Sequence, residues 1–300
     1  MENKFNFSSK FKIANIFSLI IFITSVIFII FKGLNYGIDF KGGTLIELRS
    51  NDTDASSIRS LLKNMNLGDV NVKNFGKEGD YLIKIEQKEN NGNNIIPKIK
   101  KNLSDSLKTE INFRRVENVG PKVSSELLES GIIAISLSLA AMLFYIWIRF
   151  EWQFSIGSII ALFHDIIITL GIFSLLSLEI NLSIIAAVLT IVGYSMNDTV
   201  VIYDRIRENL NKYNRLNISE IADLSINDTL ARTIITSATT LLALLSIFIL
   251  GGEILRGFSF AMILGVVIGT YSSIFVASPM LKFFKVTYKT LEKEEEKIVP

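Results

Sequence analysis

The sequence contains no cysteine and only one histidine, His164, among its 300 residues. The lack of cysteine excludes disulfides and thiolate metal sites, and a single histidine excludes a metal centre built from several histidines. Charge is almost balanced, with 31 Lys and Arg against 29 Asp and Glu, and the formal net charge of +2 points to no particular partner. We therefore expect no metal, no cofactor and no nucleic-acid partner.

Apolar residues are abundant, at 49% of the chain, with a mean hydropathy of +0.41. Several apolar runs approach the roughly 20 residues that a membrane-spanning helix needs. We expect six such helices, at residues 13–31, 132–148, 154–176, 182–203, 234–250 and 258–283. The first has too long a core for a signal peptide and is followed by no small-x-small cleavage site, so we interpret it as a retained anchor.

The orientation follows from basic residues in short loops, which collect on the cytoplasmic side. One set of loops and ends carries Lys4, Lys10, Lys12, Arg149, Arg205, Arg207, Lys212, Arg215, Lys282, Lys285 and Lys289. In the opposite short loops, 177–182 and 251–257, Arg256 is the only basic residue. We therefore predict that both termini are cytoplasmic, with residues 1–12 as the N-terminal segment and residues 284–300 as a solvated tail.

Residues 35–120 are mostly polar and long enough to form a domain on the other side of the membrane. Alternating and helical patterns within them give the order β-α-β-β-α-β, the ferredoxin-like split motif. The predicted elements lie at residues 44–50, 55–65, 69–76, 80–87, 95–108 and 111–119, with Gly76 and Gly79 near one turn. The domain contains no nucleophile–base pair and no phosphate loop, and Lys98, Lys100, Lys101 and Lys108 are interpreted as a solvated helix face.

The most informative residue is Asp198, a carboxylate well inside the apolar run 184–204. A charge in the hydrocarbon core costs at least a few kcal/mol, so such residues are usually functional. At 1.5 Å per residue Asp198 lies about 20 Å along the fourth helix, in the cytoplasmic half of the membrane. Arg232, at the predicted inner end of the fifth helix, would reach a similar depth. Opposite charge would favour ionised Asp198 and desolvation the protonated form, so this carboxyl could load and release a proton.

Arg232 also has a simpler reading, because a basic residue at the inner end of a span satisfies the positive-inside rule without any mechanism. Its helical spacing with Thr236, Thr239 and Thr240 favours function, since these residues would form one polar stripe along the fifth helix. On this reading Asp198 and Arg232 are the proton-transport residues. Asn197, beside Asp198, and Thr236 are candidates for coupling.

A second intramembrane carboxylate, Asp165, is expected about 16 Å from the cytoplasmic side of the third helix, on the same face as Thr169. It suits either a coupling role or a structural hydrogen bond to a neighbouring helix. His164 suits either proton relay or packing. Small residues, namely the GxxxG pair Gly265 and Gly269 together with Gly193, predict close helix contacts.

Five motifs, taken in order, resemble the SecF family of the bacterial SecDF protein-export complex, within the RND transporter superfamily. The motifs are Gly37-Ile-Asp-Phe-Lys-Gly-Gly-Thr44, Arg115-Val-Glu-Asn-Val-Gly-Pro121, Phe163-His-Asp-Ile-Ile-Ile-Thr-Leu-Gly171, Val192-Gly-Tyr-Ser-Met-Asn-Asp-Thr199 with Asp204-Arg-Ile-Arg-Glu-Asn209, and Thr229-Leu-Ala-Arg-Thr233 with Thr236-Ser-Ala-Thr-Thr240. Together with the predicted topology they cover nearly the whole chain.

The resemblance implies an α-helical polytopic membrane protein, an RND-like half with six transmembrane helices. Residues 130–283 would form its five-helix membrane domain and residues 35–120 its extracytoplasmic α+β domain. It also implies pairing with SecD beside the SecYEG channel in the bacterial cytoplasmic membrane, association with YajC or YidC, and contact with preprotein and membrane lipid. The proton-motive force would help complete preprotein export, with Asp198 and Arg232 matching the family's proton-transport residues.

Three alternatives remain open from the sequence. The first is half of an RND-type exporter of lipids or small molecules, and the second is a translocon scaffold that transduces no energy. An intramembrane enzyme is the least favoured, because Ser195 has no histidine on its own helix to activate it. We therefore expect no catalytic residue and a proton-driven transport subunit.

Overall fold

The computed structural model describes residues 5–50, 53–65, 67, 69–74, 78–86, 95–107, 111–213 and 215–295. The chain divides into two compact units. One comprises Met1–Asn35, Ala134–Leu178 and Ser183–Pro300, and the other comprises Tyr36–Ile133 and Glu179–Leu182.

Long apolar helices dominate the chain, and six of those in the described residues are long and apolar enough to cross a membrane. These candidate spans are Ser8–Lys32, Pro121–Arg149, Trp152–Leu175, Leu182–Lys212, Ile218–Leu250 and Leu255–Phe283. The helices in them are α1 (Phe11–Lys32, after a 3₁₀ turn at Ser8–Lys10), α5 (Pro121–Arg149), α6 (Trp152–Leu175), α7 (Leu182–Lys212), α8 (Ile218–Leu250), α9 (Gly252–Ser272) and α10 (Ser278–Phe283). A π-helix, Ser273–Ala277, joins α9 to α10, and α11 (Tyr288–Glu295) follows.

Three of the predicted helix boundaries were wrong. Helix α5 begins at Pro121 and α8 at Ile218, well before the predicted starts at residues 132 and 234, while α7 continues to Lys212. Hydropathy detects only the apolar part of a helix, whereas a polar extension persists where its ends are capped. Helix α8 starts with a capping box in which Asn217 and Glu220 satisfy each other's backbone donors.

Consequently, Arg205, Arg207 and Lys212 lie in a helix and not in the loop predicted from the sequence. The extension is held by side-chain contacts. Arg205 pairs with Asp228 of α8 at 2.8 Å, and Asn209 donates to Ser225 at 2.9 Å. Ion pairs Arg149–Asp204 at 2.7 Å and Arg207–Glu151 at 2.9 Å add further links.

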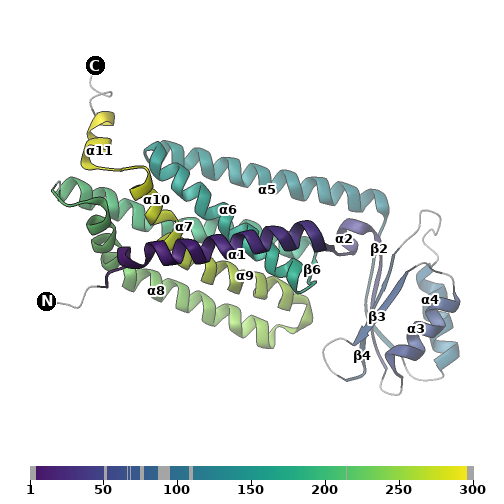
Figure 1. Cartoon of the computed structure of the whole chain (residues 1–300). Coiled ribbons are helices and arrows are strands. Elements are labelled where there is room, and N and C mark those ends of the chain that lie inside the picture. Colours follow the sequence, from purple (N-terminus) through teal and green to yellow (C-terminus); the bar gives the residue numbers. More distant parts are fainter. Residues whose placement is uncertain are drawn as a thin grey trace. The chain divides into compact units, whose positions relative to one another are not determined.

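Burial divides the spans into an inner and an outer group. The buried share is 61% for α6, 50% for α7 and 56% for the last span, against 11% for α1, 11% for α5 and 17% for α8. Helices α1 and α6 lie side by side, as do α8 and α9 (Figure 1). The outer helices expose many large apolar side chains, which suits contact with lipid or with another membrane chain.

Glycines set how closely some of these helices approach. A Cβ on Gly265 would lie 2.3 Å from Ile191 of α7, and one on Gly269 would lie 3.0 Å from Ser195, so the predicted packing role of this pair is confirmed. Gly171 likewise admits Ser25 of α1. The same prediction was wrong for Gly193, whose Cβ position has no atom within 4 Å, because this side of α7 faces no neighbour within the chain.

The second unit contains a four-stranded antiparallel sheet in the order β3-β4-β2-β5. Its elements are β2 (Gly43–Arg49), α3 (Ala55–Asn64), β3 (Val70–Asn74), β4 (Asp80–Ile85), α4 (Ile95–Leu107) and β5 (Asn112–Val119). Helices α3 and α4 cover one face of the sheet (Figure 1). The core between them is formed by Ile46, Leu48, Ile58, Leu62, Ile83, Ile85, Ile99 and Leu103. Gly76 and Lys108 lie outside the described residues.

The segment 35–43, which precedes the first strand of the sheet, is folded. It contains β1 (Asn35–Tyr36) and a short helix, α2 (Ile38–Lys41), with Ile38 and Phe40 buried. Strand β1 pairs with β6 (Glu179–Ile180), and Asp39 accepts a hydrogen bond from the Leu182 backbone amide at 2.9 Å. Residues Glu179–Leu182 therefore belong to this unit by their contacts.

Candidate functional site

Asp198 is buried in α7 with 3% of its surface exposed. Its hydrogen bond comes from Thr270 of α9, whose Oγ1 lies 3.4 Å from Oδ2, longer than the usual 2.5–3.0 Å for a hydroxyl donor. Thr270 also contacts Ser237 of α8 at 2.7 Å, and the Tyr194 hydroxyl donates to Ser237 at 3.3 Å. These contacts form a series of hydrogen-bonded side chains across α7, α8 and α9 that ends at Asp198. The Asp198 carboxylate itself is held weakly, because its hydrogen bond from Thr270 is long.

The structure places Arg232 differently from the sequence-based expectation. Because α8 begins at Ile218, Arg232 lies within this helix and not at its inner end. Its side chain is exposed, and within the described residues its guanidinium makes no ion pair or hydrogen bond.

The polar stripe beside Arg232 is present but directed at its own helix. The hydroxyls of Thr236, Thr239 and Thr240 donate to backbone carbonyls one turn earlier, including the Thr236 bond to Arg232 O at 3.0 Å. Asn197 is exposed on α7. The predicted residues of this group are therefore not joined by direct contacts in the chain by itself.

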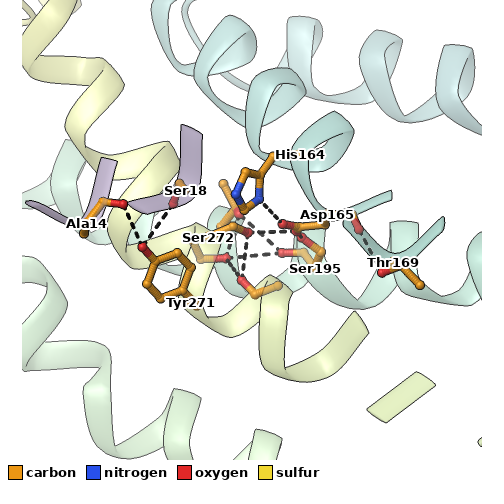
Figure 2. A network of polar contacts seen from close by, with 11 residues as sticks. Ala14, Ser18, His164, Asp165, Thr169, Ser195, Tyr271 and Ser272 are labelled. Carbon is orange, nitrogen blue, oxygen red and sulfur yellow. Dashed lines mark hydrogen bonds and ion pairs between the residues drawn. The ribbon is translucent and has the colours of Figure 1, made fainter. Parts of the chain in front are cut away.

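Asp165 is the centre of a compact polar network (Figure 2). This side chain is fully buried, with 0% of its surface exposed. Its Oδ2 accepts hydrogen bonds from Ser195 of α7 at 2.5 Å and from Ser272 of α9 at 2.8 Å. Its Oδ1 lies 2.9 Å from Nδ1 of His164. Asp165 therefore links three helices, α6, α7 and α9, through these contacts.

His164 completes the network on the side of α1. Its ring stacks on Phe22 at 6.4 Å between centroids and an interplanar angle of 5°. It is 6% exposed, and its Nε2 is a buried polar atom without a hydrogen-bond partner. Nearby, the Tyr271 hydroxyl donates to Ala14 O at 2.9 Å and accepts from Ser18 at 3.0 Å (Figure 2).

The π-helix lies directly beside these residues. Ser273, its first residue, is 2.9 Å from Thr199, the neighbour of Asp198, and donates to Gly269 O at 2.8 Å. Single-turn π-helices inside α-helices are frequent at functional sites. The π-helix therefore lies next to the residues that surround Asp165 and to those that surround Asp198.

Sequence reasoning missed the hydroxyl partners Ser195, Ser237, Thr270, Ser272 and Ser273 as site residues. Serine and threonine are ordinary in membrane helices, so each is uninformative alone. The usable signal was the cluster of three small polar residues around Tyr271 in an apolar span, Thr270, Ser272 and Ser273, directly after Gly269. Among the described residues no group of three or more His, Asp or Glu side chains is arranged to hold a metal ion.

The second unit contains separate charged groups. Ser56 and Ser57 donate hydrogen bonds to Asp54 at the start of α3 and lower the pKa of this carboxyl to about 2. Burial lowers the pKa of Lys84, which pairs with Glu179, to about 8. Asp80 accepts from both Arg49, at 2.6 Å, and Arg114, at 3.1 Å. These groups stabilise the unit and form no reactive pair.

The fold and the buried network together define a polytopic membrane protein with ionisable side chains among its spans. Its sequence matches the family model described as "Protein export membrane protein SecD/SecF, C-terminal" over residues 98–287, and "SecD/SecF GG Motif" over residues 27–54. Protein translocase subunit SecF of Rickettsia bellii is 47% identical over 282 residues, covering 93% of both chains. SecF of Rickettsia rickettsii is 46% identical over 294 residues, covering 96% of both. The chain therefore belongs to the SecF family of protein translocase subunits.

Solved structures agree with this assignment. The crystal structure of SecDF from Thermus thermophilus, described as a translocon-associated membrane protein, is 34% identical with a TM-score of 0.86 over 95% of this chain. A crystal structure of SecDF in a super-membrane-facing form gives a TM-score of 0.70 over 99% of this chain. This chain spans only 39% and 40% of those solved chains. Family and spans together identify a multi-pass protein of the inner membrane.

Proposed function

We propose that this chain is the SecF half of a proton-driven complex that helps complete preprotein export, with Asp198 and Arg232 carrying the proton step. One observation carries the proposal: Asp198 is buried within a candidate membrane span, and in the described part of the chain its carboxylate has a single, long hydrogen bond. A carboxylate that is neither solvated nor firmly paired gains little from staying ionised. It is therefore suited to binding and releasing a proton.

The opposing charge would come from Arg232 of α8. Its guanidinium has no partner among the described residues, so it remains available to Asp198 or to a group of a second chain. Each elementary charge that crosses the membrane potential yields roughly 2.3 kcal/mol per 100 mV. One proton per cycle would then suffice to bias a conformational change.

The second chain is proposed to be SecD. The solved SecDF chains are about two and a half times as long as this one, and they carry the matching region within one polypeptide. The outer spans α1, α5 and α8 expose many large apolar side chains, against which helices of the partner would pack. SecYEG, with YajC or YidC, the preprotein and lipid would be the remaining partners.

The orientation and the second unit complete the proposal. Both termini would be cytoplasmic, as the distribution of Lys and Arg predicts. The second unit, with its β2-α3-β3-β4-α4-β5 order, would be a ferredoxin-like domain outside the cytoplasm that contacts the preprotein. Asp165, Thr236 and Asn197 would couple proton binding to movements of the helices.

The experiment measures proton flux and late-stage preprotein export in vesicles that contain the complete SecDF and SecYEG complexes. Asp198→Asn should reduce both to background, because asparagine cannot take up a proton. Asp204→Asn is the matched control, since Asp204 lies on the same helix but is half-exposed and paired with Arg149. If Asp198→Asn supported normal flux and export, the proposed function would be wrong. A lipid or small molecule bound to the purified protein, with no SecD partner, would instead favour an RND-type exporter.

A further inference from the structure

We propose that His164 and Asp165 form a second proton-binding site, separate from Asp198, in which the exchanging proton binds to Nε2 of the imidazole. The arrangement that carries this inference is a buried carboxylate with donors on three helices, next to a buried imidazole with one unpartnered nitrogen. The proposal depends on the proposed function only for the route by which a proton reaches the site.

The hydrogen bonds define the unloaded form. Ser195 and Ser272 both approach Oδ2, at 2.5 and 2.8 Å. The Ser272 hydroxyl also lies 3.1 Å from Gly269 O, and because it has one proton, donation to the nearer carboxylate is the form in which Oδ2 accepts two bonds. Oδ1 then accepts from Nδ1–H of neutral His164. Three donors satisfy an ionised carboxylate, and Nε2 holds only a lone pair. The unloaded pair thus has a net charge of −1.

Adding one proton to the pair changes the protonation of one buried atom, Nε2 of His164. If His164 becomes imidazolium, the new proton is on Nε2 and Asp165 remains ionised. If the proton between Nδ1 and Oδ1 shifts to the carboxyl, Oδ1–H donates to Nδ1 and the neutral ring again has its hydrogen on Nε2. Both descriptions of the loaded pair are neutral overall, which the low-dielectric interior favours. In both of them the added proton lies on Nε2.

The surrounding elements contribute few other titratable groups. Helix α1 presents Phe22 and Ser18, and α9 presents Tyr271, whose hydroxyl is already bonded to α1. Helix α7 presents Ser195, with Asp198 one turn further along. The π-helix presents Ser273, which is bonded to Thr199, and α10 carries Lys282, which lines a pocket with Tyr213 and Leu216. Within the described residues, His164 is therefore the titratable side chain that contacts Asp165.

Loading this site would change how tightly three helices are held. Hydrogen bonds to an ionised acceptor are roughly twice as strong as those to a neutral one. When the carboxyl is neutralised, the bonds from Ser195 and Ser272 weaken, and so do the contacts of α6 with α7 and α9. Because Ser195 and Asp198 are one turn apart on α7, a proton at either site would be felt at the other.

The test uses the fact that the chain contains one histidine. The full-length protein, labelled with ¹⁵N-histidine and placed in lipid nanodiscs, gives one imidazole in ¹⁵N NMR. We expect the Nε2 signal to change from unprotonated to protonated as the pH falls between about 8 and 5, while Nδ1 stays hydrogen-bonded. A wild-type Nε2 that keeps one form across this range would overturn the proposal without any variant.

Variants separate this site from Asp198. Asp165→Asn should move the Nε2 transition by at least about one pH unit, because the ionised partner is lost. An unmoved transition would overturn the proposal.

Asp198→Asn should leave the transition present, and its disappearance would show that the site is not separate. If Asp165→Asn does not fold, Ser195→Ala replaces it, with a displaced transition expected and an unchanged one contradicting the proposal. The NMR experiment measures protonation of His164 and not transport. The second proton-binding site can therefore be confirmed when the Asp198 flux experiment contradicts the proposed function, and it can be contradicted when that experiment supports it.

Discussion

Two carboxylates buried in the same helical unit have very different surroundings. Asp165 accepts from two serines on two other helices and contacts His164, all within 2.9 Å. Among the described residues Asp198 has one donor, Thr270, at 3.4 Å, and Arg232 of α8 is exposed and makes no ion pair with it. Both are almost without exposed surface. Burial alone therefore does not distinguish them, but the number and length of their hydrogen bonds do.

This difference indicates what each residue contributes. Removing the partner of a satisfied buried group leaves donors unpaired, at a cost of about 1–3 kcal/mol for each. Removing a poorly satisfied charge relieves a desolvation penalty instead. Asp165 should thus support the packing of three helices, whereas Asp198 should contribute little to the stability of the fold. The predictions below test this contrast, from the largest expected effect to the smallest.

The largest effect is expected for Asp165→Ala. The substitution leaves Ser195, Ser272 and Nδ1 of His164 without their acceptor, so the folded protein should lose about 3–5 kcal/mol. Unfolding of the purified protein in mixed micelles, followed by circular dichroism, measures this loss. Asp165→Asn should recover part of it, because an amide oxygen still accepts. A loss below about 1 kcal/mol for Asp165→Ala would remove the contrast with Asp198.

Close helix contact beside the Asp165 network gives the second prediction. Gly265→Ala places a methyl group 2.3 Å from the Ile191 side chain, which must move. We expect a loss of about 1–3 kcal/mol from overpacking. Gly193→Ala is the matched control, because it has open space and should gain up to about 1 kcal/mol of helix propensity. Equal effects of the two substitutions on unfolding would contradict the packing described here.

Asp198→Asn should change the unfolding free energy by less than about 1 kcal/mol, since the one hydrogen bond it holds is long. Thr270→Val, which removes that donor, should behave in the same way. Ser195→Ala removes a donor to Asp165 and should cost about 1.5–3 kcal/mol. The same unfolding experiment compares all three. A larger loss for Thr270→Val than for Ser195→Ala would reverse the comparison between the two carboxylates.

The smallest effect belongs to Asp54, a carboxylate in water that serves as the reference for the two buried ones. Its pKa is about 2 in the folded protein against 3.8 ordinarily, because Ser56 and Ser57 donate to the ionised form. The cap should therefore stabilise α3 fully above about pH 4 and lose this contribution as the pH falls through about 2. Hydrogen exchange in the first turn of α3 measures it, after correction for the intrinsic pH dependence.

Asp54→Asn provides the control for this last prediction. Asparagine also caps helices well but does not titrate in this range. The first turn of α3 should then show no loss of protection between about pH 4 and 2 beyond that of the rest of the helix. Equal acid sensitivity in the wild type and in this variant would mean that Asp54 is not the titrating group.

Much of the fold was accessible from the sequence. The six apolar runs predicted six spans, and alternating and helical patterns predicted the β-α-β-β-α-β order that the second unit shows. Both signals are local, since they depend on the period of side chains along one helix or strand. The helix starts at Pro121 and Ile218 were missed because polar helical turns in water leave no hydropathy signal.

The candidate site was accessible only in part. Asp165, Asp198 and Arg232 stand out because ionisable residues are rare in spans. Their partners do not stand out: Ser195 is 30 residues from Asp165 and Ser272 is 107 residues away. The expected contact between Asp198 and Arg232 is absent from the chain by itself, since α8 turns the arginine to an exposed face. The π-helix also had no signature in the sequence.

Composition and periodicity by themselves determined that this chain has six spans and that Asp165, Asp198 and Arg232 are ionisable residues within or beside them, because apolar length and the cost of a charge in lipid are properties of short segments. Only the tertiary structure decided which of the two carboxylates is satisfied. That depends on how α6, α7 and α9 pack, with glycines at 265 and 269 allowing the serines of neighbouring helices to come within hydrogen-bond distance of Asp165. Asp198 lies one turn away from Ser195 and has a single donor, Thr270 at 3.4 Å, among the described residues, so its carboxylate is held far less firmly.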